Sequence, residues 1–80
     1  MTLQPRRVYV CVDVFQVHMP DLPPVSRALI FYLDARQLRG LPPPTIEDIC
    51  TQFMMSENDA RKHLNSLRDR NILGFKRDKE

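Results

Sequence analysis

The chain has 80 residues, 42% of them hydrophobic and 28% charged, with a net charge of +2 at pH 7. That length and composition suit one small folded domain over residues 1–80 and argue against a disordered chain. No apolar run reaches the roughly 18–20 residues of a membrane helix, and residues 1–5 lead into no signal-peptide core, so we expect a cytoplasmic protein without a membrane partner.

Residues 7–17 have the pattern of a β-strand with two apolar faces. The two sets of apolar residues are Val8, Val10, Val12 and Val14, and Tyr9, Cys11 and Phe15. Only Asp13 interrupts the second face. A short helical domain covers one face of such a strand, and an open edge invites pairing. We therefore expect a homodimer through this strand, with a monomer whose strand folds over its own first helix as the alternative.

Apolar residues at helical spacing predict a first helix over residues 25–39, ending at Gly40. Its expected core stripe is Val25, Ala28, Leu29, Tyr32 and Leu33. The segment that precedes it, from Met19 to Pro24, contains three prolines and is expected to be a stiff connector. The prolines at 42–44 predict an extended link to the next helix.

Two further helices are predicted over residues 45–54 and 56–71, each opened by a capping residue. Thr45 and Ser56 are good N-caps, and each is followed three residues later by an aspartate. The third helix has a core stripe of Ala60, Leu64 and Leu67 and ends near Asn71. In the short turn between the two helices, Met54 and Met55 are expected to fill the core.

A C-terminal strand is predicted over residues 72–77, followed by a charged tail that includes Lys79. Its expected partner is the N-terminal strand, with residues 8–15 pairing either within one chain or between two. The order strand, three helices, strand defines an α+β domain with a small antiparallel sheet.

Residues 45–73 resemble the winged helix-turn-helix regulators of the ArsR and MarR families. The matching positions are Ser56, Ala60, Arg61-Lys62-His63-Leu64, Leu67 and Asn71-Ile72-Leu73. The departures are Arg61, Lys62 and Asn71, where those families have Ser or Thr, Arg and Gly. The resemblance implies double-stranded DNA as the partner and residues 56–71 as the recognition helix. The strand at 72–77 leaves room for only a truncated wing.

Polar residues on the face of the third helix that points away from the core stripe are the expected base contacts. Basic residues near its end and in the C-terminal strand could contact phosphate. The predicted DNA-binding residues are Ser56, Asn58, Arg61, Lys62, Asn65, Arg68, Lys76 and Arg77. For Arg68, support of the helix end is an equal alternative, and for His63 we expect a packed boundary position.

The leading prediction is a sequence-specific transcriptional regulator. The alternative is a winged-helix module that binds protein, which acidic residues breaking up the basic face would favour. Enzymatic activity is not expected, because no nucleophile–base pattern or phosphate loop is present. Cys11, Cys50, His18 and His63 lack the spacing of a metal site, so no metal, cofactor or small-molecule ligand is expected.

Overall fold

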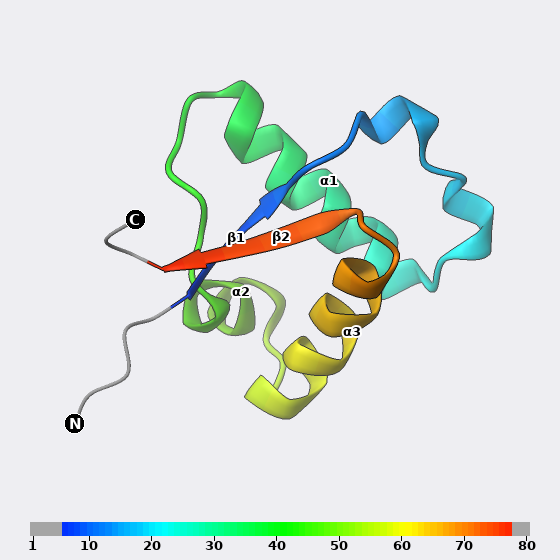
Figure 1. Ribbon diagram of the computed structural model, residues 1–80. Helices are drawn as coiled ribbons and strands as arrows, with labels where there is room; N and C mark the ends of the chain where they lie inside the picture. The colour runs from blue at the N-terminus through cyan, green and yellow to red at the C-terminus, as the bar shows by residue number, and fades with distance from the viewer. Residues whose placement is uncertain (1–5, 78–80) are drawn as a thin grey trace.

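A computed structural model describes residues 6–77, which form an α+β domain with a two-stranded antiparallel sheet and three α-helices, as predicted (Figure 1). The elements are β1 (Arg6–Val10), 3-10 turns η1 (Val14–Gln16) and η2 (Met19–Asp21), α1 (Pro24–Leu38), α2 (Ile46–Phe53), α3 (Glu57–Asp69) and β2 (Leu73–Arg77). No helix in this part of the chain is long and apolar enough to cross a membrane.

The sheet pairs the first and last elements of the described chain. Val8 lies opposite Phe75 and Val10 opposite Leu73, so the pairing is within one chain. The other edge of β1 is also occupied. The Val8 amide donates to the Pro44 carbonyl at 2.9 Å, and the Val10 amide donates to the Gln37 side chain at 2.7 Å. The edge on which we expected a second copy to pair is therefore already in use.

The strand predicted over residues 7–17 is wrong in its second half, because β1 ends at Val10. The carboxylate of Asp13 accepts a hydrogen bond from the Phe15 amide at 3.0 Å and opens the η1 turn. Such local side-chain bonds compete with a β-ladder. As a result Phe15 is 98% exposed and Val12 is 40% exposed. The apolar strand face that suggested a homodimer is thus not formed.

Helix α1 begins with Pro24 at its first position and ends at Leu38, two residues before Gly40, which has a φ of +73°. Its buried residues are Ser26, Leu29, Ile30 and Leu33. The predicted stripe was partly wrong: Val25 and Ala28 are exposed, while Ile30, which the prediction omitted, is buried. Because apolar residues surround this helix on nearly every side, their spacing alone did not identify the face that packs on the core.

Helices α2 and α3 begin as predicted. Thr45 and Asp48 form a reciprocal capping box at the start of α2. The Asp48 amide donates to the Thr45 hydroxyl, and the Thr45 amide donates to the Asp48 carboxylate, both at 3.1 Å. The Ser56 hydroxyl caps α3 by accepting from the Asp59 amide at 3.2 Å. At the other end of α3, Asn71 has a φ of +61°, as expected for a left-handed helix stop.

The turn between α2 and α3 covers only residues 54–56. Met54 has a φ of +54° and is 93% exposed, so its predicted place in the core is wrong. Met55 does pack against the core, and its amide donates to the Cys50 carbonyl at 3.1 Å. The left-handed residue ends α2 and turns its side chain to solvent, which lets α3 start immediately afterwards.

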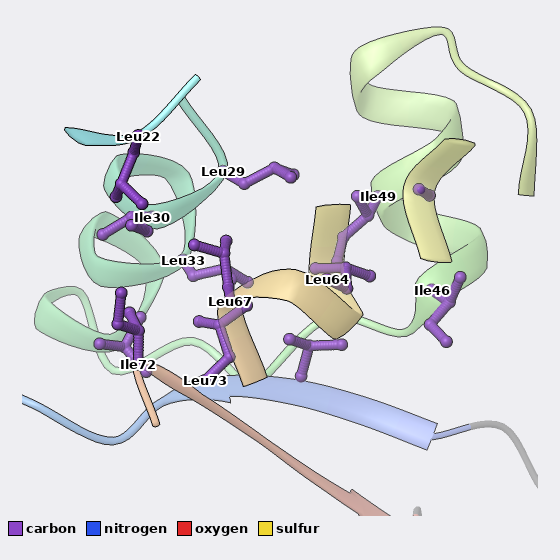
Figure 2. Close-up of a cluster of buried hydrophobic side chains, with 13 residues drawn as sticks. Leu22, Leu29, Ile30, Leu33, Ile46, Ile49, Leu64, Leu67, Ile72 and Leu73 are labelled. Carbon is purple, nitrogen blue, oxygen red and sulfur yellow. The ribbon is translucent and has the colours of Figure 1, made fainter. Parts of the chain in front are cut away.

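One hydrophobic cluster joins the helices and the sheet. Figure 2 shows side chains from α1, α2, α3 and β2 converging on it. Ala60, Leu64 and Leu67 of α3 are each 0% exposed, as the sequence predicted. The inner face of α3 is therefore fixed on the core, and this fixes the direction in which its outer face points.

Candidate nucleic-acid interface

The outer face of α3 carries the polar residues predicted to contact bases. At about 100° per residue, Asn58, Lys62 and Asn65 lie opposite the buried stripe, and all three are exposed. None of the three side chains makes a hydrogen bond or ion pair within residues 6–77. The amides of Asn58 and Asn65 and the ammonium of Lys62 are available to a ligand, and asparagine amides can bond two atoms of an adenine edge.

Arg61, at the border of this face, is already paired. Its Nη2 and Nε donate to the same carboxylate oxygen of Glu57 at 2.7 and 3.0 Å. Both side chains are more than half exposed, and exposed i,i+4 pairs contribute only about 0.3–0.5 kcal/mol. A nucleic-acid group that binds Arg61 would have to displace Glu57, a competition that the sequence prediction did not include.

Two of the predicted contact residues have structural partners. The Ser56 hydroxyl caps α3, as described above. The Arg68 guanidinium lies over the Phe75 ring, 5.3 Å from its centroid, and the Arg68 Nε is 3.9 Å from an Asp69 carboxylate oxygen. This contact packs the end of α3 on β2, and phosphate contact by Arg68 stays a prediction.

A group of basic residues that sequence analysis recognised only in part lies at the open end of the sheet. The register places Arg6 opposite Arg77 and Arg7 opposite Lys76. Lys76 is exposed, and Arg7 Nη1 donates to the Pro43 carbonyl at 2.6 Å. The side chain of Arg77 and the whole of Lys79 lie outside the described structure. The signal was present as two basic pairs in the sequence, but only the antiparallel register brings them together.

Opposed like charges on paired strands are destabilising, so this end of the sheet is a favourable place for an anion. We call the four residues Arg6, Arg7, Lys76 and Arg77 the basic strand end. Figure 1 shows that this end extends past α2, away from the junction of α3 and β2.

The charge on α3 itself is balanced. Three acidic residues (Glu57, Asp59 and Asp69) match three basic ones (Arg61, Lys62 and Arg68), and α2 adds Glu47 and Asp48 in its first turn. The positive charge of the domain is thus concentrated at the basic strand end rather than along α3.

A shallow hollow of about 360 Å³ lies between the two 3-10 turns and the end of α3. Among its lining residues, His18 Nδ1 and the Asp21 carboxylate are 2.8 Å apart, and this hydrogen bond and the nearby imidazole lower the pKa of Asp21. These polar groups bond each other rather than converging on the hollow. Within residues 6–77, no group of three His, Cys, Asp or Glu side chains is placed to hold a metal ion.

Comparison with known proteins finds no family model, no curated protein and no solved structure that matches this chain. The relation to the winged helix-turn-helix regulators therefore stays a prediction from the sequence.

Proposed function

We propose that this domain is a winged helix-turn-helix module that binds double-stranded DNA, with α3 in the major groove and the basic strand end against the sugar–phosphate backbone. One observation carries the proposal: α3 buries its whole inner stripe while presenting Asn58, Lys62 and Asn65 without partners. An α-helix held in this way can enter the major groove. Sequence-specific regulation of transcription is the role that such binding would serve.

The test is fluorescence anisotropy with mixed genomic DNA duplexes at two salt concentrations. Lys62→Ala should weaken binding and lower the salt slope by about one, as expected for loss of one phosphate contact. Asn65→Ala should relax the preference at one base position and cost roughly 1–3 kcal/mol of binding free energy. Arg39→Ala is the matched control, because Arg39 is an exposed, positively charged residue that follows the C-terminal end of α1, away from α3.

A protein-binding module is the second candidate, and the balanced charge on α3 favours it. In that case DNA affinity would be equal in the wild type, Lys62→Ala and Lys76→Ala. This result would overturn the DNA proposal, because it would leave both α3 and the basic strand end without a role in binding.

A further inference from the structure

Helix α1 has a second apolar face that the domain does not cover. Phe31 is 56% exposed and Leu38 81% exposed, and Ala28 and Ala35 are exposed on the same side. These four residues, which we call the outer stripe, follow the i, i+3, i+7, i+10 spacing of a single helix face. Figure 1 shows α1 running diagonally between the segment of the two 3-10 turns on one side and the sheet and α3 on the other.

Charged residues border the outer stripe asymmetrically. Arg27 and Asp34 are seven residues apart, which places them on the same border of the stripe two turns apart. Both are half-buried, and neither side chain has a hydrogen-bonding or ionic partner within residues 6–77. On the opposite border, Arg36 is already engaged, since it donates to the Pro42 carbonyl at 2.8 Å and lies over the Tyr32 ring.

The outer stripe and its charged border can pair with the same surface of a second copy. A two-fold axis perpendicular to α1 keeps each border on its own side and reverses the direction of the helix. The midpoint between Arg27 and Asp34 falls between Ile30 and Phe31. An axis at that level therefore brings Arg27 of one copy beside Asp34 of the other, and the reverse. It also brings the two Phe31 rings together, with the small Ala28 and Ala35 leaving room for them.

We infer that two copies of this chain associate through antiparallel α1 helices, with Phe31 at the axis and reciprocal Arg27–Asp34 ion pairs at one border. This contact replaces the N-terminal strand as the site of self-association. If the proposed DNA binding holds, such a dimer presents two α3 helices, as a two-fold DNA site requires. Self-association itself is measured without DNA, so the two proposals can fail separately.

The test is sedimentation equilibrium of the full chain at micromolar to submillimolar concentration. The wild type should shift from the 9.4 kDa monomer to a dimer as concentration rises. Arg27→Glu and Asp34→Arg should each weaken the dimer about ten-fold, because two attractive pairs become repulsive. An equimolar mixture of these two variants should regain wild-type affinity, because every pair across the mixed dimer is then of opposite charge.

Leu38→Asp should abolish the dimer, and Phe15→Ser is its matched control, since Phe15 is equally apolar and exposed but lies outside α1. Circular dichroism confirms that each variant is folded. A wild type that stays monomeric at every concentration would overturn the inference. So would a mixture of Arg27→Glu and Asp34→Arg that dimerises no more tightly than either variant alone, because only the antiparallel two-fold arrangement predicts that rescue.

Discussion

At the scale of single residues, the ion pair between Glu57 and Arg61 gives the most direct test of how α3 is used. Glu57→Gln removes a carboxylate from the outer face of the helix and releases the Arg61 guanidinium. DNA affinity should rise by roughly two- to ten-fold, because an exposed pair of this kind costs little to break and one negative charge is lost. Anisotropy at fixed salt measures the change. Unaltered or weaker binding would show that Arg61 does not face the nucleic acid.

Left-handed backbone conformations at helix ends give a second prediction. Gly40 and Met54 both have positive φ values, but only glycine adopts them without strain. Met54→Gly should stabilise the domain by about 0.5–1 kcal/mol, the strain relieved less the extra entropy of the unfolded chain. Gly40→Ala should destabilise it by about 1 kcal/mol. Urea unfolding measures both, and Asn71→Gly serves as the control, because asparagine tolerates this conformation and little change is expected.

At the scale of secondary-structure elements, the caps determine where α2 and α3 begin. The hydroxyls of Thr45 and Ser56 each accept one helix amide, and α2 has in addition a bond from the Thr45 backbone amide to the Asp48 carboxylate. Thr45→Ala and Ser56→Ala should each cost about 1 kcal/mol of the free energy of unfolding, because each removes one hydroxyl acceptor. Asp48→Ala tests the reciprocal bond of α2, because that bond joins the Asp48 carboxylate to the Thr45 backbone amide. Urea titrations measure all three variants, and an unchanged free energy of unfolding in Asp48→Ala would mean that the reciprocal bond contributes nothing.

The side chain of Tyr9 in β1 packs over Gly74 in β2. These residues are paired across the sheet, and a Cβ on Gly74 would overlap the Tyr9 ring. Valine is more favourable than glycine in a strand, so Gly74→Val should stabilise the sheet only when the Tyr9 ring is absent. A double-mutant cycle with Tyr9→Ala should thus give a coupling of about 1 kcal/mol, with Gly74→Val more favourable in the Tyr9→Ala background. No coupling would mean that the ring moves aside without cost.

Local signals explain which elements could be predicted from the sequence. The Ser and Thr caps, the spacing of Ala60, Leu64 and Leu67, and Asn71 as a stop are short-range features, and the structure confirms them. The predicted strand is interrupted where the Asp13 carboxylate accepts a hydrogen bond from the Phe15 amide. An alternating apolar pattern does not reveal this local bond. The buried face of α1 depended on which neighbours it packs against, and spacing alone does not contain that information.

In the candidate site, too, features set by local sequence were predicted and features set by tertiary contacts were not. Asn58, Lys62 and Asn65 were correctly placed on an exposed face, because helical geometry fixes that face once the core stripe is known. The pairing of Arg61 with Glu57 and the packing of Arg68 on Phe75 depend on rotamers and on tertiary contacts. The basic strand end required the register of two strands that lie at opposite ends of the chain.

For the molecule as a whole, the position of the positive charge predicts the salt dependence of DNA binding. Arg7 already donates to the Pro43 carbonyl, so Arg6, Lys76, Arg77 and Lys62 together offer about four phosphate contacts. The DNA affinity of one domain should therefore fall roughly 150-fold between 50 and 200 mM salt. Lys76→Ala should lower the slope of log affinity against log salt concentration more than Arg39→Ala does. A slope near zero would show that the strands do not contact the backbone.

The pairing of β1 with β2 also has a consequence for how the protein folds. Val8 and Val10 pair with Phe75 and Leu73 from the other end of the chain, so the sheet has the highest contact order in the domain and closes late. On the ribosome, β1 and the three helices emerge before β2, and β1 must wait for this partner strand. Folding during synthesis is then postponed until about residue 77 has left the exit tunnel, and until that moment the apolar N-terminal strand needs protection from aggregation.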